Sequence, residues 1–144
     1  MVDETKVITN YKLDLKGLTK EEKDTAKERV GSYITSKIIK FLGNSSSPVQ
    51  GAPFQVLKAD KTVSRLFETG SLWSNIEHGH YRDGVQIGVF EPDDIPKGFN
   101  HNVGDTLPTR RFIPLKGEKF KPSIINGVNA IMKRIRSGDS GDDD

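Results

Sequence analysis

The 144-residue chain contains no cysteine, so disulfide bonds and thiolate metal ligands are excluded. It has no run of 18 apolar residues, and we therefore expect no transmembrane helix. Its first ten residues, MVDETKVITN, do not combine a basic region with an apolar stretch as a signal peptide does. These absences predict a soluble protein that does not contact a membrane and is not exported through a signal peptide.

Apolar residues are also scarce. They make up 33% of the chain, and Trp73 is the single tryptophan. Globular proteins contain about 45–50% apolar residues when glycine is counted among them. We therefore expect a modest core, with much of the chain in loops or in contact with partners. Small domains of this kind are often stabilised by assembly, which favours an oligomer.

The small net charge of +2 conceals an uneven distribution. The last eight residues, SGDSGDDD, carry four aspartates and no cation. The rest of the chain holds 22 basic and 16 acidic residues, a net charge of +6. We predict a single domain over residues 1–136 and a disordered acidic tail over residues 137–144. The basic residues are spread along the chain, so we expect no specific nucleic-acid recognition.

A short strand is predicted near the N-terminus. Tyr11, Leu13 and Leu15 alternate with charged residues, and this period of two is typical of a half-buried strand. Gly17 is the predicted end of that strand.

A helix over about residues 20–42 is predicted next. Thr19 and Glu22 have the spacing of a capping box, in which each side chain accepts a hydrogen bond from the other residue's backbone N–H. Gly43 is expected to end the helix at its C′ position. Apolar residues recur at spacings of three and four along one face: Ala26, Val30, Tyr33, Ile34, Ile38, Phe41 and Leu42.

The second half of the chain predicts a hairpin and a closing helix. Residues 85–89 alternate, and so do residues 72–76, although Leu72 and Ile76 would equally suit one helical turn. YRDG at 81–84 predicts an Asp-Gly turn before the second strand. The closing helix is expected to begin at Pro122. Its apolar stripe is Ile124, Val128, Ile131 and Ile135, and its basic last turn holds Lys133, Arg134 and Arg136. The predicted fold is α+β: a small antiparallel β-sheet packed against two long amphipathic helices, with a long extended loop at 91–114.

Residue types that carry chemistry are few. His78 and His80 form an HxH pair, and two imidazoles on one strand face can reach one metal ion. An acid for such a site would come from Glu91, Asp93 and Asp94; the alternative is that both histidines lie in a loop. The sequence holds no GxSxG elbow, P-loop or GxGxxG motif. We therefore expect no enzymatic activity, metal or cofactor.

The stretch HNVGDTLPTRRFIP, residues 101–114, is the strongest candidate for a contact surface. Pro108 and Pro114 favour extended geometry around Arg110 and Arg111. A guanidinium suits a carboxylate of a neighbouring subunit; the alternatives are that the two arginines bind phosphate or are simply solvated. Trp73 is either a core residue or an interface anchor.

Four fragments resemble the neck and tail-completion proteins of tailed bacteriophages, a head-to-tail joining family that includes tail terminators. They are SPVQG at 47–51, ETGSLWSNI at 68–76 with VQIGVF at 85–90, HN…LPTRRFIP at 101–114, and FKPSI at 120–124. Their order spans about residues 20–136. The N-terminal strand and the acidic tail lie outside the match.

This resemblance implies a structural virion component rather than an enzyme. Such proteins have a β-sheet packed on helices and form closed rings at the head–tail junction, after synthesis in the host cytoplasm. We expect a homo-oligomer, a hexamer or alternatively a dodecamer, that contacts the tail tube or sheath and the head connector. The expected subunit or partner interface consists of Arg110, Arg111, Phe112, Ile113 and Trp73. The alternatives are a head-closure or adaptor ring on the portal, a small metal-dependent enzyme using His78, His80 and a nearby acid, and a basic nucleic-acid-binding module.

Overall fold

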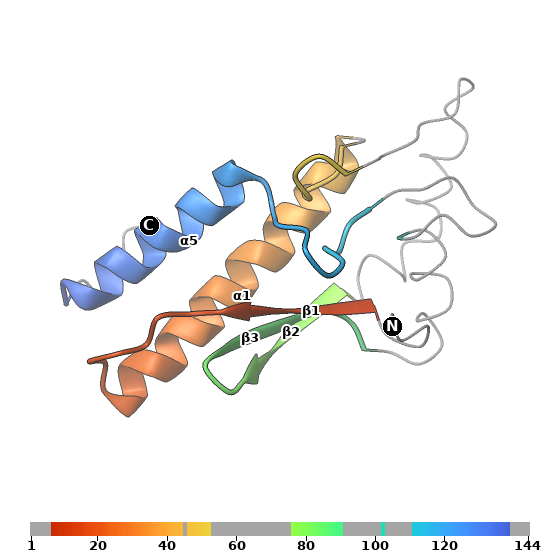
Figure 1. Cartoon of the computed structure of the whole chain (residues 1–144). Helices are drawn as coiled ribbons and strands as arrows, with labels where there is room; N and C mark the ends of the chain where they lie inside the picture. Colours follow the sequence, from red (N-terminus) through yellow and green to blue (C-terminus); the bar gives the residue numbers. More distant parts are fainter. Residues whose placement is uncertain (1–6, 45, 53–75, 91–101, 103–110, 139–144) are drawn as a thin grey trace, which may run out of the picture.

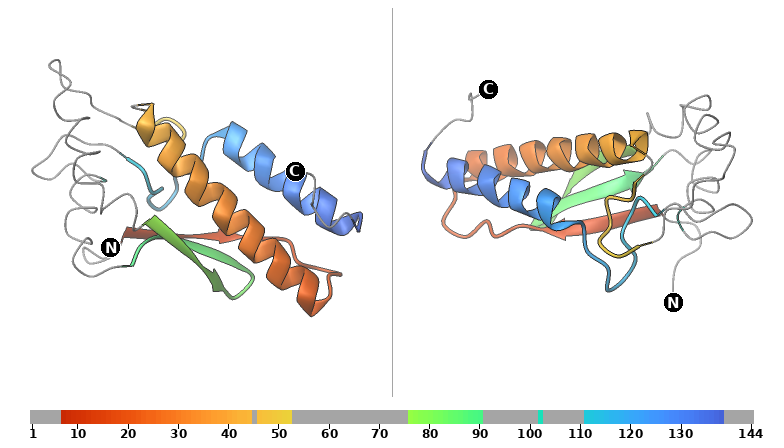
Figure 2. Two further views of the ribbon diagram at one scale, coloured as in Figure 1. Left: turned by 180° about the vertical axis from the view of Figure 1, so that it is seen from behind. Right: turned by 90° about the horizontal axis from the view of Figure 1, so that it is seen from above.

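The computed structural model describes residues 7–44, 46–52, 76–90, 102 and 111–138. The elements follow in the order β1 (Val7–Lys12), α1 (Lys20–Gly43), β2 (Ile76–Tyr81), β3 (Gly84–Val89) and α5 (Pro122–Arg136). The strands form one layer, and α1 and α5 form a second layer beside it (Figures 1 and 2). The predicted α+β class, with a small antiparallel sheet and two helices, is confirmed. With 24 and 15 residues, α1 and α5 are helices of moderate length rather than long ones.

The three described strands are ordered β1-β3-β2, and both neighbours of β3 run antiparallel to it. Val85, Ile87 and Val89 of β3 are fully buried, as their alternation predicts. The antiparallel hairpin is also confirmed, but its first strand lies later than predicted: β2 covers Ile76–Tyr81 instead of residues 72–76, and residues 72–75 lie outside the described structure. The hairpin loop consists of Arg82 and Asp83, and the positive φ of 47° falls on Arg82 rather than on a glycine.

The N-terminal strand lies earlier than the sequence predicts. It covers Val7–Lys12, whereas Leu13 and Leu15 lie beyond its end. Both leucines are nevertheless buried, and the Leu13 N–H donates to the carbonyl of Asp83 at 2.8 Å. The alternation of apolar and charged residues therefore indicates which side chains are buried, and this burial continues past the last residue of the strand.

Helix α1 begins as predicted and ends differently. The Thr19 N–H donates to Glu22 Oε1 at 2.9 Å, and the Glu22 N–H donates to Thr19 Oγ1 at 3.1 Å, so the capping box is confirmed. Gly43 is the last helical residue, and Asn44 caps the helix at φ −100°, so the predicted glycine C′ stop is wrong. The buried stripe comprises Ala26, Val30, Gly31, Ile34, Ile38 and Leu42.

Helix α1 packs against both the sheet and α5. It contacts β2, β3 and α5, and residues from all five elements belong to one buried apolar cluster. Helix α5 begins at Pro122, as predicted, and buries Ile124, Val128 and Ile135. Neither helix of the described residues has the length and hydropathy needed to cross a bilayer.

The body has two distinct ends. At one end lie the start of β1, the start of β2 and the end of β3, which pair across the sheet (Figure 1). The segment before α5 also lies there and bonds to the segment after α1 through Arg111 and Ser47. We call this the loop end, because the irregular segments 46–52 and 111–121 meet there. At the opposite, hairpin end lie the β2–β3 turn, the start of α1 and the last turn of α5 (Figure 1).

Close packing of α5 on α1 gives a test of the fold. A Cβ added at Gly127 would overlap the Tyr33 phenol. We expect Gly127→Ala to destabilise the protein by about 1–3 kcal/mol despite its better helix propensity. Chemical denaturation measures this free energy of unfolding.

Two variants serve as controls for this measurement. Asn129→Ala, at an exposed position of the same helix, is expected to be neutral or slightly stabilising. Tyr33→Ala removes the overlapping ring, so adding Gly127→Ala to that variant should cost little or nothing further. If Gly127→Ala lowered the free energy of unfolding equally in the native chain and in the Tyr33→Ala variant, this packing would be contradicted.

Candidate functional site

The structure describes three of the five predicted interface residues. Phe112 and Ile113 are buried in the apolar cluster, with 0% and 1% of their surface exposed, and Arg111 lies beside them. Their side chains thus pack within the chain. Trp73 and Arg110 lie outside the described residues, so their interface role stays a prediction.

The amide of Asn102 holds this segment in place. Asn102 is 2% exposed, and its Oδ1 accepts hydrogen bonds from the N–H groups of Phe112 (2.8 Å) and Ile113 (2.9 Å). Its Nδ2 donates to the carbonyl of Ile113 at 3.0 Å. A side-chain amide offers two donors and one acceptor oxygen, and Asn102 pairs both kinds of group with the backbone of two consecutive residues. We call this arrangement the Asn102 clamp.

Arg111 extends the clamp with a charged pair. Its Nε lies 3.1 Å from Glu118 Oε1, and the exposed fractions of the two side chains are 12% and 27%. The same Glu118 oxygen accepts from the Leu115 N–H at 2.9 Å, and an Arg111 Nη1 donates to the Asn102 carbonyl. Arg111 is therefore engaged inside its own chain, rather than solvated.

A third contact joins the clamp to the segment after α1. Ser47 Oγ donates to the Arg111 carbonyl at 2.6 Å and accepts from the Val49 N–H at 3.0 Å. Val49 also forms an isolated antiparallel bridge with Phe120. Sequence reasoning missed the roles of Ser47, Asn102 and Glu118, because polar residues in loops carry no periodic signal. Their only hint was their position inside or beside the fragments of the phage resemblance.

The two histidines lie on a strand and not in a loop. Both belong to β2 and face α1, where Nε2 of His78 lies 3.1 Å and Nε2 of His80 lies 3.5 Å from the carboxylate of Glu28. Gly31 allows this approach, because a Cβ there would overlap the His78 ring. Among the described residues, no group of three or more histidine, aspartate or glutamate side chains is arranged so that it could hold a metal ion. The acids at Glu91, Asp93 and Asp94 lie outside them.

The histidines perturb the carboxylate that they face. The hydrogen bond from His78 is the main cause that holds the pKa of Glu28 below its ordinary value; burial acts in the opposite direction, and His80 contributes less. This group ties α1 to β2 and offers a carboxylate with two imidazoles at the surface. It is exposed, since 62% of the Glu28 side chain is accessible to solvent.

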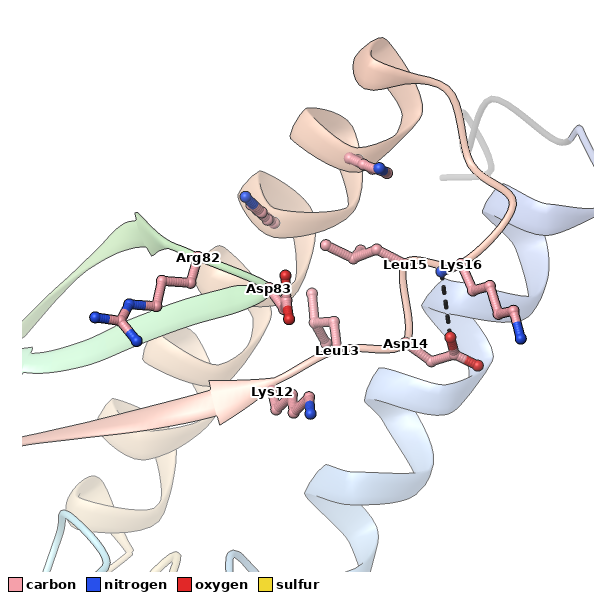
Figure 3. A pocket seen from close by; sticks show the side chains of 9 residues that line it. Lys12, Leu13, Asp14, Leu15, Lys16, Arg82 and Asp83 are labelled. Carbon is pink, nitrogen blue, oxygen red and sulfur yellow. Dashed lines mark hydrogen bonds between the residues drawn. The ribbon is translucent and has the colours of Figure 1, made fainter.

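An open pocket of about 800 Å³ lies at the hairpin end (Figure 3). Leu13 and Leu15 supply its apolar floor between the end of β1 and α1. Five cationic side chains line it, against two acidic ones. The lining residues are Lys12, Leu13, Asp14, Leu15, Lys16, Lys23, Lys27, Arg82 and Asp83. We call it the lysine pocket; sequence reasoning missed it because its cations come from three separate segments.

Comparisons with known proteins add no relative. No family model, curated protein or solved structure matches this chain.

The clamp predicts a large effect from one buried amide. Asn102→Ala leaves two backbone N–H groups without their acceptor, and each unsatisfied buried group costs about 1–3 kcal/mol. We expect a total loss of roughly 2–4 kcal/mol in the free energy of unfolding, measured by denaturant titration. The matched control is Asn10→Ala, which breaks an exposed bond with Gln86 and should cost less than about 0.5 kcal/mol. Similar losses of unfolding free energy in both variants would show that the clamp stabilises the protein no more than an exposed hydrogen bond does.

The Glu28 cluster predicts an acid-dependent contribution to stability. Because the folded pKa of Glu28 is lowered, its contribution is complete above the ordinary pKa and disappears as the pH falls through the folded pKa. Glu28→Gln should therefore be less stable than the native chain at pH 5–6, by less than about 1 kcal/mol for so exposed a pair. The difference should shrink and then vanish as the pH is lowered through the folded pKa, as thermal unfolding at a series of decreasing pH values would show. A constant difference over the whole range would contradict the linkage.

Proposed function

We propose that this chain is a structural subunit of a bacteriophage neck, of the tail-completion or tail-terminator type. In this proposal it forms a homo-oligomeric ring, a hexamer or alternatively a dodecamer, that joins the tail tube or sheath to the head connector at the head–tail junction. Binding is its task, and it needs no catalytic residue or cofactor.

The observation that carries the proposal is where the fragments of the resemblance lie. Ser47 of SPVQG bonds to Arg111 of LPTRRFIP, and Asn102 bonds to Phe112 and Ile113 of that same fragment. Val49 of SPVQG bridges to Phe120 of FKPSI. Pieces far apart in the sequence thus form one hydrogen-bonded unit, and this supports reading them as parts of one family pattern.

The division of the molecule into a body and a loop end also supports a ring subunit. A closed ring needs heterologous contacts, in which one patch of each subunit meets a different patch of the next. The clamp fixes Asn102 and Arg111 at the loop end, so the intervening residues 103–110 start and finish at a rigid base. We propose that the residues between these two fixed points, 103–110 with Arg110 among them, form the part of the predicted 91–114 arm that reaches a neighbour, with Trp73 as a second contact. A rigid base lowers the ordering cost of such a contact.

The runner-up is a head-closure or adaptor ring bound to the portal, which would use the same arm on a different layer of the neck. A small metal-dependent enzyme built on His78 and His80 has less support, because the carboxylate that the described structure brings to them is Glu28 of α1, on an exposed surface.

Arg110 provides the cleanest test of the arm. Arg111 pairs with Glu118 inside the chain, so an alanine there would mix folding with assembly. We expect Arg110→Ala to keep the native free energy of unfolding while reducing ring formation at least about tenfold in concentration, as light scattering across a dilution series would measure. Lys116→Ala, at an exposed position outside 91–114, is the matched control and should assemble like the native chain. Unchanged assembly of the Arg110 variant would remove the arm from the proposal.

The decisive experiment is genetic. Disrupting this gene in the phage that encodes it should leave separate heads and tails, or tails of irregular length, in electron micrographs of lysates. Supplying the native chain from a plasmid should restore joined particles. Normal infectious particles without the chain would overturn the proposed function.

A further inference from the structure

The lysine pocket has an excess of positive charge that the acidic side chains of the described residues do not balance. Its seven charged side chains leave three positive charges in excess. One of its two acids, Asp14, is already engaged: its Oδ1 accepts from the Lys16 N–H at 3.2 Å and lies 3.6 Å from Arg136 Nη2. Arg82 stacks over the Tyr81 ring, so the four lysines dominate the rim. Such a surface fits an acidic segment.

The last turn of α5 touches the rim of this pocket. Arg136 Nη1 donates to the Lys16 carbonyl at 2.8 Å, and Nη2 donates to the Asp14 carbonyl. These contacts fix the point where the chain leaves α5, only two residues before Gly138. The segment beyond, residues 139–144, carries four aspartates and no cation.

The geometry points to an intramolecular occupant. We propose that the acidic segment 139–144 docks on the lysine pocket of its own chain and shields it from other polyanions. Six extended residues reach about 20 Å, which is ample from a helix end that already contacts the rim. Attachment to the same chain also gives the segment an effective concentration in the millimolar range for a short linker, so weak individual charge pairs suffice.

This inference does not rest on the proposed function. Docking within one chain is a property of the monomer at the hairpin end, whereas ring assembly is assigned to the loop end. A monomeric protein can therefore show docking, and a ring-forming protein can lack it.

Carbodiimide cross-linking of the full chain tests the proposal, because it joins a carboxylate to an amine only in direct contact. Mass spectrometry should find links from Asp139, Asp142, Asp143 or Asp144 to the pocket lysines, Lys12, Lys16, Lys23 and Lys27. A mixture of ¹⁵N-labelled and unlabelled protein should give links within one chain. Raising the salt to 1 M, where the screening length falls to about 3 Å, should lower the yield at least about threefold.

Charge reversal in the pocket supplies the matched comparison. Lys23→Glu with Lys27→Glu should reduce the remaining links to Lys12 and Lys16 at least about threefold. Lys116→Glu with Lys119→Glu, at exposed positions outside the pocket, changes the net charge equally and should leave those links unchanged. The proposal would be overturned by any of three results. The links could be confined to Lys133 on α5, they could form only between labelled and unlabelled chains, or their yields could be equal in both variants.

Discussion

The buried amide of Asn102 is the interaction on which the loop end depends. Its side chain satisfies two N–H groups and one carbonyl of the 112–113 backbone, in a place where water does not reach. Phe112 and Ile113 can enter the core only because their backbone polar groups find these partners. Without the clamp, these backbone groups would be buried without hydrogen-bond partners. Burying the segment would then cost more free energy than its apolar side chains contribute.

Where the two helices of this fold begin follows from short-range sequence rules, whereas where the first strand ends follows from tertiary contacts. The capping box at Thr19 and the proline at the start of α5 are local devices, so sequence alone places both helix starts. The strand near the N-terminus is harder, because alternation reports which side chains are buried and not which backbone groups are paired. Leu13 and Leu15 are buried outside the strand for this reason.

The candidate site is less predictable than the fold. Sequence reasoning selected 110–113 for its prolines and arginines, but assigned the side chains of 111–113 to contacts with another subunit, whereas these side chains pack and bond within the chain. Glu28 and its two histidines are 50 or more residues apart in sequence and meet only through the packing of α1 on β2. The lysine pocket likewise arises from three segments. Contacts between polar side chains that are distant in the sequence leave no periodic pattern in it, so they can be identified only once the topology is known.

The sheet has a consequence for how the protein is made. Among the described strands, β1 pairs with β3 alone, so its ladder hydrogen bonds, such as those between the Val7 and Val89 positions, form only after β3 is available. The β2–β3 hairpin is local, but every contact of β1 with the sheet has a large sequence separation, which slows folding. On the ribosome β1 therefore emerges long before β3 and stays unpaired until β3 has been synthesised. An unpaired strand edge is a template for association with other chains, and the charged residues at and just after the end of β1, Lys12, Asp14 and Lys16, limit that risk.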